Sequence, residues 1–274
     1  MQVKICISFV KELIKKVDMN MLTIKQLLVL TDNYIYLIHD DVSGETAVID
    51  PAEAKPVLDY LAEMNWQLTY ILNTHHHLDH VGANVVLKQK TGCQIVAAEV
   101  DWDRIPGIDQ GLKAGDVITL GAHPIQVFET HGHTNGHIVY YFTEDQAVFC
   151  GDTLFVMGCG RLFEGTPEEM YRSLQQLKEL PADTRVYCAH EYTEANGRFA
   201  LSIEPDNECL QEKMRIVAQL RAEQKSTVPS TIEQERVTNP FLRVDSLGVQ
   251  KTLGLIGEPP VRVFTELRKR KDNW

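Results

Sequence analysis

Residues 74–80 read THHHLDH, so four histidines and one aspartate fall within six consecutive positions. The segment follows LTYILN at residues 68–73, an apolar and aromatic run typical of a β-strand. Side chains alternate between two faces in an extended chain, so His75 and His77 can converge on one ion while His76 points away. A histidine-rich loop can also be a solvated surface, but the HxHxDH spacing favours a metal site.

Three later segments offer further ligands. His133 lies in ETHGHTNGH, Asp152 in FCGDTLF and His190 in VYCAHEYT, and each residue follows a run with the composition of a strand. Loops at strand ends hold side chains on a rigid scaffold, which is where binding residues concentrate. One histidine or aspartate in such a place is usually structural. Three of them, added to THHHLDH, predict a clustered site for two metal ions.

Two regions of different character follow one another along the chain. Up to His190, short β-branched or aromatic runs alternate with turn residues and two helix-like stretches, which predicts an α/β region. The segment TPEEMYRSLQQLKELP at residues 166–181 begins with a capping box and with Pro at the first helical position, and it predicts a helix. Beyond His190 the pattern becomes helical. We expect an N-terminal extension outside the fold at residues 1–20, an α/β domain at residues 21–190 and a helical domain at residues 191–274.

Composition limits the possible partners. The chain has 274 residues, of which 44% are apolar, enough for a sizeable core. Its net charge of -11 makes nucleic acid and anionic membranes unsuitable partners, because both require a basic surface. An anionic small molecule would therefore have to meet a local basic cluster.

The cysteines and the first residues bear on the compartment. The six cysteines are scattered and form no CxxC pair, which favours reduced thiols in a cytoplasmic protein. The first twenty residues contain only a short apolar run, which disfavours export and membrane insertion. A surface helix or a weak targeting segment are the alternatives to the simple extension expected there.

The motifs THHHLDH, GHTNGH, GDTLF and HEYT, in this order, resemble the metallo-β-lactamase superfamily. Together with GCGR, TNPFLR and the basic end LRKRKD, they resemble the glyoxalase II (hydroxyacylglutathione hydrolase) family within it. The resemblance extends from about Leu22 to Trp274. It implies a four-layered αββα sandwich followed by a smaller C-terminal helical domain.

The resemblance also implies a ligand set for two divalent metal ions. Zinc is the expected metal, with iron or manganese as alternatives, because histidine and carboxylate ligands accept all three. The implied ligands are His75, His77 and His133 for one ion, Asp79, His80 and His190 for the other, and Asp152 as a bridge between them. Of the remaining histidines, we expect His131 and His137 to be structural and His39 and His123 to lie at the surface.

Such a site predicts hydrolysis. Two divalent ions about 3.5–4 Å apart can lower the pKa of a shared water towards roughly 7, which would supply a bridging hydroxide as nucleophile. Asp79 and Asp152 would hold the metals and orient that nucleophile. A thiolate leaves a thioester with little protonation, so no dedicated general acid is required. By resemblance, the substrate is S-(2-hydroxyacyl)glutathione, typically S-D-lactoylglutathione, which gives glutathione and D-lactate in the second step of methylglyoxal detoxification.

Glutathione carries two carboxylates, so it would need the local basic cluster. By resemblance, the glutathione part is bound by Arg161, Phe163, Tyr192, Arg268 and Lys271. Some relatives carry tyrosine where Phe163 stands, which removes one hydroxyl from this set. Basic tails such as RKRKD are often only solvated, and the role of this one depends on the resemblance. We expect a monomer that acts on a small molecule.

Several alternatives remain open at this point. Glutathione persulfide dioxygenase, a mononuclear iron oxidoreductase of the same superfamily, is the main one, although those relatives lack the long helical C-terminal region. A nuclease would be expected to have a basic surface, and β-lactamases commonly carry cysteine where Asp152 stands. A module that binds metal without catalysis would be expected to lack some of the seven ligands.

Overall fold

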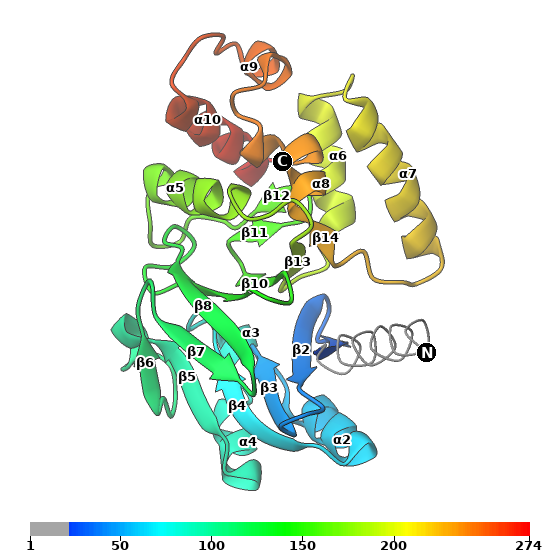
Figure 1. Ribbon diagram of the computed structural model, residues 1–274. Helices are drawn as coiled ribbons and strands as arrows, with labels where there is room; N and C mark the ends of the chain where they lie inside the picture. Colours follow the sequence, from blue (N-terminus) through cyan, green and yellow to red (C-terminus); the bar gives the residue numbers. More distant parts are fainter. Residues whose placement is uncertain (1–21) are drawn as a thin grey trace, which may run out of the picture.

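The computed structural model describes residues 22–274, so the extension expected at residues 1–20 lies outside the described residues. Two six-stranded sheets face each other, with helices on both outer sides (Figure 1). This arrangement confirms the expected αββα class. The first sheet has its strands in sequence order: β1 (Thr23–Val29), β2 (Asn33–His39), β3 (Glu45–Ile49), β4 (Gln67–Leu72), β5 (Gln94–Ala98) and β6 (Gln110–Leu112).

The second sheet includes a strand from the C-terminal region. Its spatial order is β14 (Ser230–Thr231), β13 (Arg185–Cys188), β10 (Ala147–Gly151), β9 (Ile138–Phe142), β8 (His123–Glu129) and β7 (Val117–Leu120). The short strands β11 (Leu154–Phe155) and β12 (Gly158–Cys159) form a separate pair.

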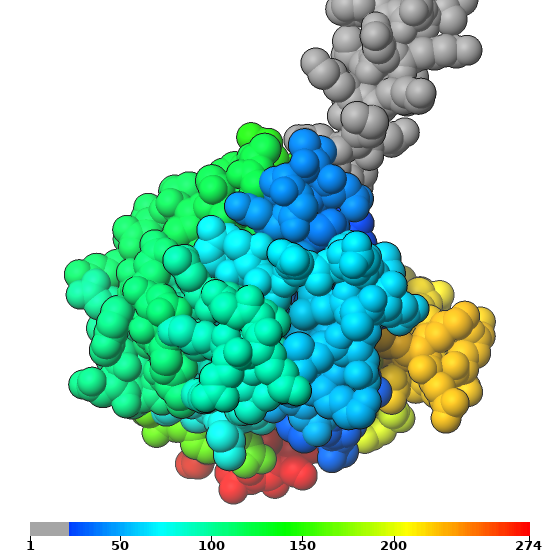
Figure 2. Space-filling model, turned by 90° about the horizontal axis from the view of Figure 1, so that it is seen from below, coloured from blue at the N-terminus to red at the C-terminus, as the bar shows by residue number. Residues whose placement is uncertain are grey.

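Helices α2 (Ala54–Met64) and α4 (Asn84–Thr91) cover the first sheet, and η1 (Glu99–Asp101) follows β5. Figure 2 shows this face of the molecule, with the segments coloured blue to cyan beside those coloured green. On the opposite side lie α5 (Pro167–Lys178), α6 (Thr193–Ile203), α7 (Glu208–Ala222), α8 (Ile232–Thr238), η2 (Pro240–Leu242), α9 (Leu247–Leu253) and α10 (Pro260–Asp272) (Figure 1). Within residues 22–274, no helix combines the length and apolar character needed to cross a bilayer.

The predicted helix after Thr166 is confirmed as α5. The Thr166 hydroxyl accepts the backbone N–H of Glu169, and the Glu169 carboxylate accepts the backbone N–H of Thr166. This reciprocal cap satisfies amide groups that the first helical turn leaves without partners.

Strand β2 shows why its sequence has no polar–apolar alternation. Tyr36 and Ile38 face the core between the sheets, whereas Ile35 and Leu37 face the core beneath α2 and α4. A strand covered on both sides is apolar at nearly every position.

The strand directions bring the candidate ligands to one edge of the sandwich. Strands β3 and β4 run parallel, so their C-terminal ends meet at this edge. Strands β10 and β13 are also parallel. Strand β8 runs in the same direction as β10, because both are antiparallel to β9, which lies between them. The backbone N–H of Ile138 donates to the Thr74 carbonyl at 2.9 Å and joins the two sheets there.

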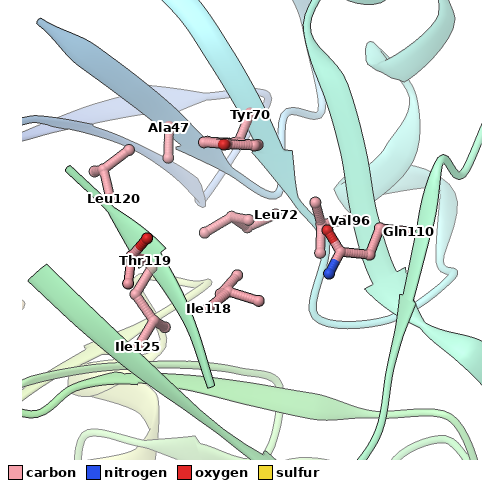
Figure 3. Close-up of a pocket in the computed structure, with 9 residues that line it drawn as sticks. All are labelled: Ala47, Tyr70, Leu72, Val96, Gln110, Ile118, Thr119, Leu120 and Ile125. Atoms are coloured by element: carbon pink, nitrogen blue, oxygen red, sulfur yellow. The ribbon is translucent and has the colours of Figure 1, made fainter. Parts of the chain in front are cut away.

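A small gap remains between the sheets near their β6 and β7 edge (Figure 3). Leu72 and Val96 from the first sheet and Ile118 and Ile125 from the second point into it. Its volume of about 110 Å³ is below the range of roughly 300–1,000 Å³ usual for small-molecule sites. We therefore regard it as a packing gap.

The expectation that His39 and His123 lie at the surface is wrong. His39 is 6% exposed, bonds to Thr46 Oγ1 at 2.8 Å and stacks on Trp66 with ring centroids 4.0 Å apart. His123 is 1% exposed, with Nδ1 2.8 Å from a carboxylate oxygen of Asp145. Buried imidazoles are tolerated when their polar atoms find partners.

Candidate metal centre

Three imidazoles from two sheets converge at the strand ends. His75 and His77 follow β4, and His133 follows β8. The His77 Nδ1 lies 3.1 Å from His75 Nε2 and 3.1 Å from His133 Nε2. The sequence predicted this grouping for His75 and His77 from their alternate positions, and the structure brings all three together.

A second group lies beside the first. Asp79 and His80 belong to the short helix α3 (Leu78–Val81), which turns these side chains away from the direction of the preceding loop. The Asp79 Oδ2 lies 3.6 Å from both His80 Nε2 and His190 Nε2. One ligand atom from each of the three residues falls within 4.8 Å of the others.

Asp152 lies between the two groups. Its Oδ1 is 3.6 Å from His80 Nε2 and 3.3 Å from His190 Nε2, while its Oδ2 is 3.4 Å from His133 Nε2. The two oxygens of this carboxylate therefore face different groups, which is the arrangement that a bridging ligand requires. Gly151, with φ +47, lies so close to the Thr74 and His137 side chains that a Cβ there would overlap them.

The donor set fits divalent metal ions. Two buried atoms that point into the cluster, His80 Nε2 and Asp152 Oδ1, have no hydrogen-bond partner among the described residues. Buried polar atoms are normally satisfied, and a cation between a nitrogen and a carboxylate oxygen would satisfy both. Imidazole and carboxylate are suitable ligands for zinc, iron and manganese.

The outward ring nitrogens of these histidines have their own partners. His80 Nδ1 lies 3.0 Å from Asp50 Oδ2, and His190 Nδ1 lies 2.9 Å from Asp32 Oδ1. His133 Nδ1 donates to the Arg161 carbonyl at 2.9 Å. Such contacts fix the tautomer, so that the inward nitrogen presents a lone pair.

Asp32 and Asp50 were not predicted as part of the site. Asp50 directly follows β3 and accepts the backbone N–H of Thr74 at 2.7 Å, which also holds the loop that carries His75 and His77. Its position after an apolar run is the signal that singled out Asp152, and it could have been used here too. Asp32 lies in the turn before β2 and has no comparable signal.

Electrostatics divide the histidines into two kinds. Burial lowers the pKa of His75, and burial together with neighbouring His133 lowers the pKa of His77 to about 4. Burial also opposes a charge on His190, but the carboxylates of Asp152, Asp32 and Asp79 together outweigh it and raise the pKa of His190 to about 9. The carboxylates of Asp152 and Asp50 likewise raise the pKa of His80 against the effect of burial, so metal binding at His80 and His190 would compete with protons.

Other histidines near the cluster have different contacts. His76 belongs to neither of the two groups described above. The His137 Nε2 accepts the backbone N–H of Asp152 at 3.1 Å, so His137 helps to hold Asp152 between the two groups. His131 is exposed and bonds to the Asn135 carbonyl.

A cavity of about 560 Å³ opens onto the cluster, which is within the usual range for small-molecule sites. It reaches from His133 and Asp152 to α10 and the C-terminal Trp274. Its lining includes all five residues expected to bind glutathione, Arg161, Phe163, Tyr192, Arg268 and Lys271.

These lining residues differ in their freedom to bind. Arg268 is 4% exposed and already donates to the Cys159 carbonyl at 2.9 Å and to Asp272 at 2.9 Å. Lys271 has no ion pair among the described residues, and burial and the charge of Arg268 lower its pKa. The ring of Tyr192 stacks on His190 at 4.7 Å, which links this side of the cavity to the metal cluster.

Known proteins resemble this chain over nearly its whole length. Residues 29–190 match the family model of the metallo-beta-lactamase superfamily, and residues 191–274 match that of the hydroxyacylglutathione hydrolase C-terminus. A hydroxyacylglutathione hydrolase of Methylococcus capsulatus is 54% identical over 92% of this chain and 98% of its own. Another, from Maricaulis maris, is 51% identical over 93% of this chain and 100% of its own.

Solved structures share the fold at lower identity. ETHE1 from Myxococcus xanthus is 24% identical and superposes with a TM-score of 0.64, covering 91% of this chain and 98% of its own. The BLEG-1 B3 metallo-beta-lactamase is 22% identical with a TM-score of 0.62, covering 80% of this chain and 99% of its own. The match of the C-terminal region and the identity to the two hydrolases favour the hydrolase interpretation over persulfide dioxygenase. This chain belongs to the hydroxyacylglutathione hydrolase family of the metallo-β-lactamase superfamily.

Proposed function

We propose that this enzyme hydrolyses the thioester of S-(2-hydroxyacyl)glutathione. S-D-lactoylglutathione would give glutathione and D-lactate, the second step of methylglyoxal detoxification. The observation that carries the proposal is the position of Asp152, which faces both groups of histidines and also lines the cavity. The relatives named hydroxyacylglutathione hydrolase support the substrate class.

In this proposal, His75, His77 and His133 hold one divalent ion, Asp79, His80 and His190 hold the other, and Asp152 contacts both. The bound ions would supply an activated water at neutral pH and polarise the acyl carbonyl. We propose zinc in both positions, with iron and manganese as alternatives.

The two carboxylates of the site would orient the reactants. The Asn33 amide donates to Asp79 Oδ2 at 2.9 Å, which fixes the Asp79 carboxylate. The Asp79 side chain nevertheless remains 40% exposed. The hydrogen bond from Asn33 favours the ionised form of Asp79, so this carboxylate can accept a hydrogen bond from the attacking water. The thiolate of glutathione leaves without a proton donor, and the proposal assigns no residue to that role.

The basic wall of the cavity would bind the glutathione part. Lys271 and the exposed Arg161 offer charges to its carboxylates, since neither has a carboxylate partner among the described residues. Arg268 would donate further hydrogen bonds to glutathione through the N–H groups that do not already bond to Cys159 and Asp272. The Tyr192 hydroxyl and the backbone at Phe163 would hold the cysteinyl portion near the metals.

We further propose a division of labour along the chain, with the metal site in residues 21–190 and most of the glutathione contacts in residues 191–274. All five described cysteines are free, which supports a reducing compartment and hence the cytoplasm. The proposed form is a monomer that acts on a small molecule.

The test is hydrolysis of S-D-lactoylglutathione by the full chain, followed by release of free thiol and by metal analysis. We expect turnover that requires metal and is lost in Asp152→Asn, while glutathione persulfide causes no oxygen uptake. Wild-type protein that holds two metal ions per chain but does not release thiol would contradict the proposal.

A further inference from the structure

His76 is the one histidine of the THHHLDH segment that neither candidate metal group uses, and it faces a network of charged side chains. Its Nδ1 lies 3.5 Å from Asp101 Oδ2, and its Nε2 lies 3.6 Å from Glu164 Oε1. Arg104 joins the two carboxylates, since its Nε donates to Asp101 at 2.9 Å and its Nη1 to Glu164 at 2.6 Å. We call His76, Asp101, Arg104 and Glu164 the Arg104 network.

Asp101 is the buried member of this network. Its side chain is 0% exposed, and it is the last residue of η1, in the connection between β5 and β6 of the first sheet. A buried carboxylate is costly unless it is paired, and Arg104 supplies the pairing. Gly136, next to the loop of His133, packs so closely against this carboxylate that a Cβ there would overlap it.

Glu164 extends the network to the loops of the second sheet. Its Oε2 accepts the backbone N–H of Asn135 at 2.7 Å, two residues beyond His133. On either side of Glu164, the backbone N–H of Phe163 donates to the His133 carbonyl and that of Gly165 to the Gly132 carbonyl. The Phe163 ring then packs edge-on against His133 at 5.2 Å and against His77 at 5.5 Å.

The two candidate metal groups differ in their relation to this network. His75 and His77 flank His76, and His133 lies on the loop that Glu164 holds. By contrast, His80 and His190 are held by Asp50 and Asp32, which belong to other loops. The Arg104 network therefore touches the supports of one group and not of the other.

We propose that the Arg104 network is a positioning device that sets the geometry, and so the metal affinity, of the His75–His77–His133 group and holds the Phe163 loop over it. The inference rests on the metal assignment in the proposed function. Arg104 is a positioning residue here, because it touches neither the ligand atoms nor the cavity lining. A guanidinium fork is suited to this role since it can hold two carboxylates at fixed angles.

The test measures zinc affinity at one position at a time. In a His190→Ala background the remaining ion reports on the three-histidine group, and in a His77→Ala background it reports on the other group. Zinc competition with a chromogenic chelator is then compared with and without Arg104→Met. Loss of outer contacts typically costs roughly 10–100-fold in metal affinity, so we expect a decrease of about tenfold or more in the first background and less than about twofold in the second.

Two further variants keep the test decisive. Glu164→Gln, at a side chain 26% exposed, breaks one arm of the network without leaving Asp101 unpaired, and it serves if Arg104→Met does not fold. Lys88→Met is the matched control, because it breaks an ion pair with Asp109 of similar exposure, 35% and 34%, away from the metal loops. We expect Glu164→Gln to act like Arg104→Met, and Lys88→Met to change neither affinity.

Equal losses in both backgrounds would overturn the inference, because they would indicate general destabilisation. Unchanged affinity in both would also overturn it, and the network would then be an ordinary ion-pair cluster. Wild-type protein that binds fewer than two zinc ions would instead contradict the metal assignment in the proposed function. The two failures are therefore distinguishable.

Discussion

Asp50→Asn isolates one outer contact of the proposed metal centre. The Asp50 carboxylate accepts from Thr74 N at 2.7 Å, from Thr74 Oγ1 at 2.6 Å and from His80 Nδ1 at 3.0 Å. Asparagine keeps the size of the side chain and tolerates the positive φ of 50 at this position. However, its amide must turn an N–H group towards at least one of these donors. The contact that we expect to be lost is the hydrogen bond from His80 Nδ1, which fixes the tautomer in which His80 Nε2 carries the lone pair for the metal.

The cost follows from the burial of the site. Asp50 is 3% exposed and His80 1% exposed, so water cannot replace the lost acceptor. A buried donor left without a partner costs about 1–3 kcal/mol, which corresponds to roughly one to two orders of magnitude in affinity. We expect Asp50→Asn to weaken zinc binding at the Asp79–His80–His190 group by that factor, in chelator competition with the His77→Ala variant as background.

Two comparisons sharpen this prediction. Asp32→Asn changes the equivalent contact at His190, but the Asp32 side chain is 34% exposed, so water can compensate and the loss should be smaller. Asp59→Asn, at a carboxylate 63% exposed on α2, should have no effect. If Asp50→Asn left zinc affinity within twofold of its parent, the outer contact would not determine ligand strength and the reasoning would be refuted.

Four further predictions concern the cavity and the fold. Lys271→Met should raise KM by about tenfold with little change in kcat, since a hydrogen bond to a charged group is worth about 1.5–3 kcal/mol; an unchanged KM would contradict the role in binding. Burial and the charge of Arg268 lower the pKa of Lys271 from 10.5, and Lys271 is charged only below its pKa. Wild-type kcat/KM should therefore fall as the pH rises through a value below 10.5, and this fall should be absent in Lys271→Met. Phe163→Tyr should lower KM a few-fold by adding a hydroxyl worth about 1 kcal/mol, and a higher KM would show that the hydroxyl has no acceptor. Thr166→Ala removes the cap of α5 and should cost about 1 kcal/mol, or roughly 2–4 °C in Tm, with activity unchanged; an unaltered thermal unfolding curve would argue against the cap.

Local patterns in the sequence were sufficient for much of the fold and for the members of the site. The capping box after Thr166 predicts α5 because its two contacts involve residues three positions apart. The alternate positions of His75 and His77 likewise make their convergence readable from the chain alone. The seven residues that the resemblance placed on two metals are brought together in the structure, although their roles as ligands remain a proposal.

What the sequence could not provide was the surroundings of these residues. The contact from Asp32 to His190 spans more than 150 positions, and nothing near Asp32 distinguishes it from an exposed turn residue. His39 and His123 were expected at the surface for the same reason, because the partners that make their burial tolerable lie elsewhere in the chain. Arg268 shows a further limit, since its sequence does not reveal that Cys159 and Asp272 already occupy several of its donor hydrogens.

Strand β14 has a consequence for folding cooperativity. It comes from the C-terminal region, yet it is the edge strand of the second sheet and pairs with β13, which leads directly to His190. Without it, β13 would expose a row of unpaired backbone groups, a known route to aggregation. We therefore expect residues 22–190 and 191–274 to unfold together, and a protein shortened to residues 22–190 should fail to fold alone rather than retain the proposed metal site.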